Sequence, residues 1–453
     1  MNRKAVFLLW IAALLVFGSC NTKNDDTTIN PFDTMSVSSN SARDKIVVIS
    51  DLHLGNDLSY SENVHHLQRL EQFLNEIRTS STVKELVIGG DMLDEWYIPT
   101  RTDTYGGGTQ ADFVRKSVEA NQGVFDVLNS IITDGKIKVT YIPGNHDMGF
   151  TPENINIALP GINQARDDDG KFQVGTYHPE GYPEIAIEHG HRYDFFCAMT
   201  PNAIDDAPES ILAPGYFFAR IAANSFTDPT TPEEATKVGT VVLNDSTSAE
   251  QVSKNTYYSL WKIIMENVIY VKDDFNEPII TTNIGGLTQT YAINDIIPRN
   301  SEADGSIQMN LYNNLFTQAS WDERQLYNNV KSLSDINTAM VGSLETEFID
   351  ERANAQYFDK SDSDVRIVVF GHTHIPMIKT YLNHKGQQCI YANSGSWEDK
   401  KSRDKNSNID QDQENMDFIT IVPVKSDLKK LQVALHQYQK GQHILKDSKE
   451  VEL

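Results

Sequence analysis

The chain has 453 residues, of which 39% are hydrophobic and 23% are charged, so it can form a large core and is not a disordered protein. It has 63 acidic and 39 basic residues and a formal charge of -24, which opposes binding to a nucleic acid duplex. This charge disfavours a large polyanionic substrate, although bound metal dications would reverse the field locally.

The N-terminal residues have the form of an export signal. Two basic residues precede an apolar stretch from 5 to 17, which is too short for a membrane span of about 20 residues. Small residues then lead into Cys20, and the segment resembles a bacterial lipoprotein signal, which is cut before a cysteine that receives the lipid. The alternative is an ordinary cleaved secretory signal. We expect a signal peptide over 1–20, a disordered tether over 21–43, and an extracytoplasmic protein lipid-anchored at Cys20 to a bacterial membrane, on the periplasmic face or the cell surface.

Cys197 and Cys389 are the other two cysteines. In an oxidising compartment they either form a disulfide or remain free buried thiols. Their spacing does not suggest a structural zinc site.

Strand-like apolar runs near the start of the chain end in polar residues. The β-branched run 45–50 leads into Asp51-Leu52-His53, and the run 85–88 leads into Gly89-Gly90-Asp91. Apolar residues at helical spacing over 62–78 predict a helix between them. This order predicts a βαβ unit in a parallel sheet, with both polar clusters at the same edge.

The same pattern returns further along the chain. Residues 111–132 are predicted to be helical, and the run 136–142 ends in the turn Pro143-Gly144-Asn145-His146-Asp147. Two further runs, 184–188 and 365–370, end in His189-Gly190-His191 and Gly371-His372-Thr373-His374. Hairpins are expected over 377–392 and 418–438.

From 200 to 364 the chain lacks this pattern of apolar runs that end in polar clusters, and it is acid-rich and predicted to be mostly helical or irregular. We interpret this stretch as an insertion or cap that divides a core into the parts 44–199 and 365–440, with a C-terminal tail over 441–453. Because the insertion begins soon after one histidine cluster and ends just before another, we expect it to lie near the site and to form a substrate lid.

Side chains at these strand ends offer carboxylate, amide and imidazole ligands without a thiolate, a donor set that suits Mn, Fe or Zn. The candidates are Asp51, His53, Asp91, Asn145, His189, His372 and His374. Two ions that share a carboxylate need about this many ligands.

In their order along the chain, the motifs D-x-H, G-D, G-N-H-D, H and G-H-x-H resemble those of the calcineurin-like metallophosphoesterase superfamily. The resemblance implies an α/β (α+β) fold, a four-layer αββα sandwich of two mixed sheets flanked by helices, here with a large, mostly helical insertion. It also implies a dimetal phosphohydrolase that cleaves a phosphomonoester or phosphodiester of a small molecule through hydroxide held between two divalent or trivalent ions.

The resemblance further implies a role for each residue. The first metal ion would be held by Asp51, His53 and His374, and the second by Asn145, His189 and His372, with Asp91 bridging both. His146 would stabilise or protonate the leaving oxygen, and Asp147 or another carboxylate would orient its ring. His191 is either a support or a substrate contact, and would replace His189 only if the loop register differed.

Residues 90–96, with the sequence GDMLDEW, resemble a segment of UDP-2,3-diacylglucosamine hydrolases. This finer resemblance implies pyrophosphate cleavage in a nucleotide-sugar or a lipid-linked nucleotide. Those enzymes act on the cytoplasmic side and lack so long an insertion, so the alternative is that Asp94 supports Asp91 and Trp96 belongs to the core. A reading from another class is a non-catalytic surface lipoprotein that binds a glycan or protein partner.

Overall fold

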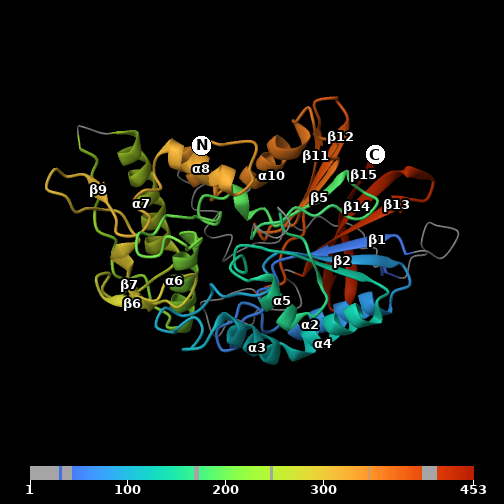
Figure 1. Cartoon of the computed structure of the whole chain (residues 1–453), viewed down its shortest axis with the longest axis horizontal. Helices are drawn as coiled ribbons and strands as arrows, with labels where there is room; N and C mark the ends of the chain where they lie inside the picture. Colours follow the sequence, from blue (N-terminus) through green and yellow to red (C-terminus); the bar gives the residue numbers. More distant parts are fainter. Residues whose placement is uncertain (1–29, 33–42, 168–172, 245–247, 346, 400–415) are drawn as a thin grey trace.

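The computed structural model describes residues 30–32, 43–167, 173–244, 248–345, 347–399 and 416–453. The expected signal peptide and the lipidation site at Cys20 lie outside these residues. Two β-sheets lie in the right-hand part of the molecule as drawn in Figure 1, and helices lie on their outer sides.

The larger sheet has seven strands in the order β15-β14-β13-β1-β2-β3-β4. Its strands are β1 (Lys45–Ile49), β2 (Val83–Gly89), β3 (Lys138–Ile142), β4 (Asn163–Gln164), β13 (Asp417–Val424), β14 (Asp427–Gln439) and β15 (Gln442–Glu452). Strands β1 to β4 run parallel, and β13 pairs antiparallel with β1. The parallel strands therefore bring the segments after β1, β2 and β3 to one edge of the sheet.

The smaller sheet has the order β11-β12-β10-β5. Its strands are β5 (Ile185–Ile187), β10 (Ile367–Phe370), β11 (Met377–Leu382) and β12 (Gln388–Asn393). Strands β5, β10 and β12 are parallel, whereas β11 is antiparallel to β12. This pairing places the two remaining histidine clusters, which follow β5 and β10, side by side.

The two sheets pack face to face through β-branched side chains. On β1, the side chains of Ile46 and Val48 are buried in the cluster between the sheets, where Ile187 and Val369 of the smaller sheet also lie. The alternate residues Val47 and Ile49 belong to the cluster on the other face of the larger sheet. A strand buried on both faces explains the continuous apolar run in the sequence.

Helices complete the outer layers. The larger sheet is covered by α2 (Leu67–Thr79), α3 (Gln110–Ala120), α4 (Gln122–Asp134) and α5 (Pro152–Ala158). Over the smaller sheet lie α10 (Phe348–Ala353) and the π-helical segment η4 (Asn354–Phe358), where Tyr381 of β11 donates a hydrogen bond to Asp350. The predicted αββα sandwich of two mixed sheets is therefore confirmed.

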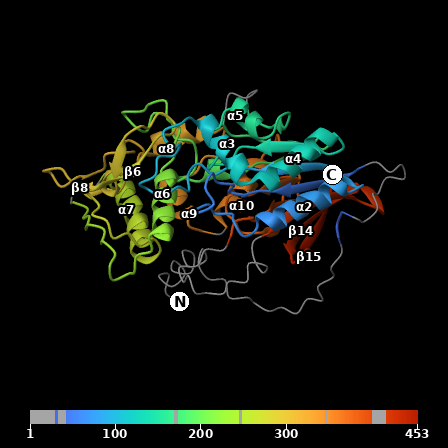
Figure 2. The same ribbon diagram turned by 90° about the horizontal axis from the view of Figure 1, so that it is seen from below.

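The remaining helices and hairpins lie between 200 and 364. They are α6 (Gly215–Thr227), α7 (Ala249–Asn267), α8 (Gln318–Tyr327), α9 (Ile336–Gly342), the hairpin of β6 (Pro278–Thr281) and β7 (Thr290–Ala292), and the pair β8 (Arg299–Asn300) and β9 (Ile307–Gln308). In Figures 1 and 2, α6, α7 and these hairpins lie at the opposite end of the long axis from β13 and β14.

A buried arginine joins this region to the core. The guanidinium of Arg220, on α6, donates to the backbone carbonyls of Ile98, Pro99, Thr100 and Thr102. These residues directly follow the GDMLDEW segment. The guanidinium has a fixed fork of donors, so it holds α6 and this loop in one arrangement.

Two helices differ from the expectation. The segment predicted as one helix over 111–132 is divided into α3 and α4 at Asn121, whose side-chain amide donates 2.8 Å hydrogen bonds to the carbonyls of Gly55 and Ser117. Helix α2 begins at Leu67, because the preceding turn donates its backbone amides, including that of His65, to the carboxylate of Asp399 instead of forming a helical turn.

The ends of the described chain also differ from the expectation. Residues 441–453 are not a free tail, because β15 pairs along β14. Within the expected tether, Phe32 is buried and packs against Phe73 and Phe418, at ring-centroid distances of 5.6 and 5.9 Å. Phe32 therefore anchors residues 30–32 to the core, and most of the expected tether lies outside the described residues.

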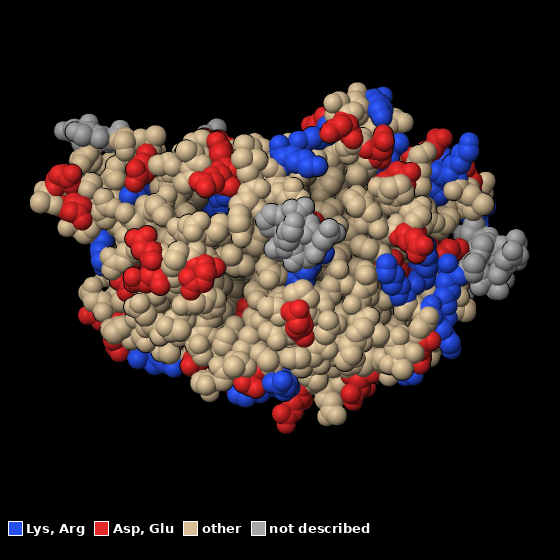
Figure 3. All heavy atoms as spheres, in the orientation of Figure 1, with Lys and Arg blue, Asp and Glu red and all other residues tan. Residues whose placement is uncertain are grey.

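Cys197 and Cys389 are free thiols. Within the described ranges, no helix combines the length and the apolar character that crossing a bilayer requires. Charged side chains of both signs are scattered over the face drawn in Figure 3, and basic ones gather toward the side of β13 and β14.

Candidate metal centre

The strand ends that carry the predicted ligands have an unusual backbone. Five of these ligands adopt left-handed conformations with φ between 46° and 67°, namely Asp51, His53, Asp91, His372 and His374. Residues other than glycine rarely occupy this region, and such strain gathers at functional sites. The sharp turns direct carboxylates and imidazoles from different strands toward one another.

Two glycines in the motifs are required by close approach. A Cβ atom at Gly144 would overlap the carboxylate and backbone of Asp91, and one at Gly371 would overlap the side chains of Asp51 and Ser50. The glycine of each motif therefore makes room for a side chain that belongs to another motif.

One group of predicted ligands consists of Asp51, His53 and His374. The Nε2 atom of His374 lies 3.0 Å from Oδ1 of Asp51 and 3.3 Å from Nε2 of His53. Two imidazole nitrogens that face each other at this distance beside a buried carboxylate suit a shared cation. The three side chains predicted to hold the first ion are thus together.

A second group consists of Asp51, Asp91 and His189. The Nε2 atom of His189 lies 3.1 Å from Oδ2 of Asp91 and 3.1 Å from Oδ1 of Asn145. The same Asp91 oxygen lies 3.8 Å from Nε2 of His53. Asp91 therefore lies between the two groups, as its predicted bridging role requires.

The outer nitrogen of each of these imidazoles is engaged. The Nδ1 atom of His53 lies 2.9 Å from Asp94 and 3.1 Å from Glu62, and Nδ1 of His374 lies 3.1 Å from Glu398. In His189, Nδ1 donates to the carbonyl of Gly89 at 2.9 Å. A proton held at Nδ1 leaves the lone pair of Nε2 directed into the group, which is the arrangement of metal-binding histidines.

The electrostatics of these groups also suit a cation. Burial alone would raise the pKa of Asp91, but His189, His146 and His53 hold it well below its usual value. Burial alone would lower the pKa of His53, but Asp94 and Asp91 raise it to about 9, and the pKa of His189 rises to about 9 because of Asp91 and Asp51. Buried carboxylates here demand positive charge, which bound metal ions would supply, so the residues fit the metals that the sequence implies.

His372 is held differently from the other three histidines. Its ring centroid lies 5.2 Å from that of His189, and its backbone amide donates to the Asp51 carboxylate at 3.1 Å. Its Nε2 atom, however, lies 3.0 Å from Oδ2 of Asp194. The nitrogen left for a cation is therefore Nδ1.

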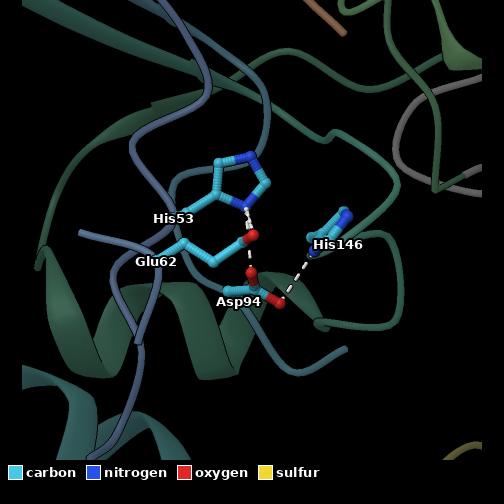
Figure 4. A group of neighbouring side chains, drawn as sticks. All are labelled: His53, Glu62, Asp94 and His146. Atoms are coloured by element: carbon cyan, nitrogen blue, oxygen red, sulfur yellow. Dashed lines mark hydrogen bonds and ion pairs between the residues drawn. The ribbon is translucent and has the colours of Figure 1, made fainter. Parts of the chain in front are cut away.

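His146 lies at the edge of the first group. Its Nδ1 atom lies 2.8 Å from Oδ1 of Asp94, whose other oxygen contacts His53, so Asp94 stands between the two rings (Figure 4). The indole of Trp96 packs against the His146 ring at a centroid distance of 5.0 Å. The side chain is 15% exposed, so its free Nε2 atom can reach a substrate.

Asp94 is ionised in this arrangement. Burial alone would raise its pKa, but hydrogen bonds and charges from His146 and His53 hold the pKa of this carboxyl well below its usual value. The anion fixes a proton on Nδ1 of His146 and leaves Nε2 directed away from the pair.

Asp147, which we predicted as one candidate for orienting the His146 ring, contacts backbone amides instead. Its carboxylate accepts hydrogen bonds from the backbone amides of Gly144, at 2.6 Å, and of Met92, at 2.8 Å. Asp147 therefore holds the turn after β3 against the turn after β2. The carboxylate that contacts the His146 ring is Asp94.

His191 lies beside the second group but outside it. Its ring is buried, with a centroid 5.4 Å from that of His189, and neither ring nitrogen has a hydrogen-bond partner among the described residues. Burial, together with His189 and His372, lowers the pKa of His191 well below its usual value. Of the two histidines after β5, it is His189 that contacts Asp91.

Three carboxylates at the site were missed by the sequence reasoning, namely Glu62, Glu398 and Asp194. Glu398 directly follows Asn393-Ser394-Gly395-Ser396-Trp397 at the end of β12, a strand end of the kind that identified the other clusters. Asp194 directly follows a histidine cluster. Glu62 lies in a loop without any comparable signal.

One comparison with known proteins, that with family models, agrees with the motifs. The model of a family described as calcineurin-like phosphoesterase matches residues 44–376. No curated protein matches the chain significantly. Among solved structures, a single mutant of Vps29 from Entamoeba histolytica is similar over 90% of this chain and 99% of its own, with 10% identity and a TM-score of 0.25.

Proposed function

The chain belongs to the calcineurin-like phosphoesterase family of metal-dependent hydrolases, and from this premise we propose that it hydrolyses a phosphomonoester or phosphodiester of a small molecule. The observation that carries the proposal is the convergence of four strand ends on buried carboxylates and imidazoles, with His146 at their edge. A scaffold without catalysis has no need of a histidine held in this way.

We propose that the site binds two ions of Mn, Fe or Zn. Asp51, His53 and His374 would hold the first, Asn145, His189 and His372 the second, and Asp91 both. Bound cations would activate water for attack on phosphorus and neutralise the charge that develops on the phosphoryl oxygens.

His146 supplies the proton in this proposal. Its Nδ1–H group donates to Asp94, so the ring cannot turn without loss of a charge-assisted hydrogen bond. The Trp96 indole covers one side of the ring and limits its tilt. When Nε2 also carries a proton, the ring can donate that proton to the leaving oxygen as the ester bond breaks.

We propose that the insertion over 200–364 forms one wall of the substrate site. Arg220 attaches it to the loop after Trp96, and Trp96 contacts both His146 and, at 6.2 Å between centroids, Tyr216 of α6. The insertion is thus linked to the ring that would donate the proton.

The GDMLDEW segment gives no separate support to a pyrophosphate substrate. Asp94 is explained by its contacts with His146 and His53, and Trp96 by its packing on His146. Both roles serve any phosphate ester, so the ester hydrolase is the reading that we propose.

The test is an assay of the full-length chain, stripped with EDTA and then supplied with Mn²⁺. The substrates are p-nitrophenyl phosphate, bis-p-nitrophenyl phosphate and a set of nucleotide and sugar phosphates, including a nucleotide-sugar. We expect metal-dependent hydrolysis of at least one ester. The ratio of the kcat/KM values for p-nitrophenyl phosphate and bis-p-nitrophenyl phosphate separates a monoesterase from a diesterase. Cleavage of the nucleotide-sugar alone would instead favour the pyrophosphohydrolase.

We also propose that the protein is extracytoplasmic and anchored in a bacterial membrane through a lipid on Cys20, with a small phosphorylated molecule as its partner. The support for the anchor and the location is the form of residues 1–20 alone. Cys20→Ser should move the protein from the membrane fraction to the soluble fraction of the producing bacterium. An unchanged distribution would favour an ordinary secretory signal.

A further inference from the structure

Asp194 lies between a predicted metal ligand and the insertion. It follows the short helix η2 (His191–Tyr193), and it is 8% exposed. Its Oδ2 atom faces Nε2 of His372 at 3.0 Å. Its Oδ1 atom accepts hydrogen bonds of 2.7 Å from the backbone amide of Phe196 and from the hydroxyl of Ser343.

This contact determines which nitrogen of His372 can bind a cation. A carboxylate only accepts hydrogen bonds, so Nε2 of His372 carries the proton and Nδ1 carries the lone pair. In His53, His189 and His374, Nδ1 contacts a group outside the proposed ion site, and Nε2 faces the other proposed ligands. His372 therefore differs from the other three histidines, because its Nδ1 atom rather than its Nε2 atom is the one available to a cation.

We propose that Asp194 is a positioning residue that directs Nδ1 of His372 to the second metal ion, and that Ser343 makes the insertion a part of this support. The inference rests on the proposed two-ion site and deepens it. Asp194 itself binds no ion in this account; it acts through the tautomer and orientation of His372.

Ser343 is a residue of the insertion that contacts the support of a proposed metal ligand. It directly follows α9, and its hydroxyl lies within hydrogen-bond distance of both the Asp194 carboxylate and the carbonyl of Ala339. The charged carboxylate is the stronger acceptor of the single hydroxyl proton. With the amide of Phe196, the hydroxyl fixes Oδ1 in place and so directs Oδ2 toward His372.

The substitution Asp194→Asn gives a directed test of this tautomer. Two donors require an oxygen at the Oδ1 position, so the new amide nitrogen would face Nε2 of His372. An amide N–H donates to Nε2 and shifts the imidazole proton to Nδ1, where it removes the lone pair that a cation needs. The change is nearly isosteric and targets the ring of His372 without removing it.

The experiment measures Mn²⁺ binding to the full-length protein by isothermal titration calorimetry, with electron paramagnetic resonance spectra at each stoichiometry. The wild type should bind two ions and show the spectrum of an exchange-coupled pair. Asp194→Asn should keep one ion, lose the coupled spectrum at one to two equivalents, and bind the second ion about 10- to 100-fold more weakly. Asp126→Asn, an exposed position on α4, is the matched control and should behave as the wild type.

Ser343 provides a second, milder test. Ser343→Ala should weaken binding of the second ion about fivefold, as expected for the loss of one hydrogen bond, and Ser343→Thr should restore the affinity. Should Asp194→Asn fail to fold, the alanine and threonine pair decides the question alone. Rescue by threonine is not expected if Ser343 only packs against its neighbours.

The outcomes separate this inference from the proposed function. A wild type that binds fewer than two ions would contradict the two-ion site, and the inference would fall with it. If the wild type binds two ions, either of two results would overturn the role of Asp194 and leave the proposed function standing. The first is a folded Asp194→Asn protein with unchanged affinity for the second ion and a coupled spectrum. The second is unchanged affinity for the second ion in Ser343→Ala.

Discussion

The Oδ1 atom of Asp94 lies 2.8 Å from the Nδ1 atom of His146, while the other oxygen of the same carboxylate lies 2.9 Å from Nδ1 of His53. One buried anion therefore orients both the proposed acid and a proposed ligand of the first ion. Since His146 is not itself a proposed ligand, its removal separates the proton transfer from metal binding.

His146→Ala should lower kcat about 10²- to 10⁴-fold, because the leaving oxygen loses its proton donor. The content of bound metal, measured by elemental analysis after gel filtration, should stay at the wild-type value. His178→Ala removes an exposed histidine and is the matched control, with no expected effect. Loss of both ions in His146→Ala would show that His146 had been assigned the wrong role.

Phe32→Ala should destabilise the fold by about 3 kcal/mol, because it opens a cavity among buried aromatic rings. The carbonyl of Phe32 also accepts hydrogen bonds from Ser80 and Thr82, which keep this segment against the core. Urea unfolding measures the change, with Phe226→Ala, a partly exposed position, as the control of smaller effect. Equal unfolding midpoints for wild type and Phe32→Ala would mean that Phe32 is not anchored.

Arg220→Met should destabilise the protein by about 3 kcal/mol or more, since it leaves carbonyls of the loop 98–102, including those of the buried Ile98 and Thr100, without donors. Limited proteolysis should then cut more readily between α6 and this loop. Arg115→Met removes an exposed arginine that makes a single ion pair, and it should change the free energy of unfolding by less than about 1 kcal/mol. Similar behaviour of the two variants would contradict the attachment that we describe.

His436 should make stability depend on pH. Burial, and then the nearby His443, lower the pKa of His436 to about 3, and its ring stacks on Phe418. The unfolded chain takes up a proton on this imidazole near the usual pKa of 6.5, but the folded protein does not. The contribution of neutral His436 to the free energy of unfolding is therefore complete above that pH and is lost as the pH falls from about 6.5 toward 3.

Urea unfolding at about pH 7 and about pH 5 tests this expectation. The wild type should lose more stability between the two pH values than His436→Gln, which has no imidazole to protonate. Comparing the two proteins removes the contribution of other titrating groups. Identical losses would mean that His436 is protonated in the folded state.

Much of the fold and site could be predicted from the sequence because the signals are local. Strand β1 is a β-branched run buried on both faces, and Asp51 and His53 follow it within a few residues. A ligand that directly follows a strand can be predicted without knowledge of loop geometry. The same holds for Asn145 and His189.

Other features depend on contacts that no local pattern encodes. Strand β15 is polar along most of its length because it is an edge strand with one solvent-exposed face, so its sequence resembles a tail. The division of α3 from α4 follows from the bond of Asn121 to the distant Gly55. Asp194 and Glu62 reach the histidines through loops whose paths the tertiary structure decides.

We propose that two bound ions make this site a phosphoesterase. The most direct test titrates Mn²⁺ into EDTA-stripped, full-length protein and measures bound metal and the hydrolysis rate of p-nitrophenyl phosphate and bis-p-nitrophenyl phosphate in the same samples. We predict little hydrolysis with one ion and a steep rise as the second binds. Two ions bound without hydrolysis of these or any other phosphate ester would contradict the claim and favour a binding role.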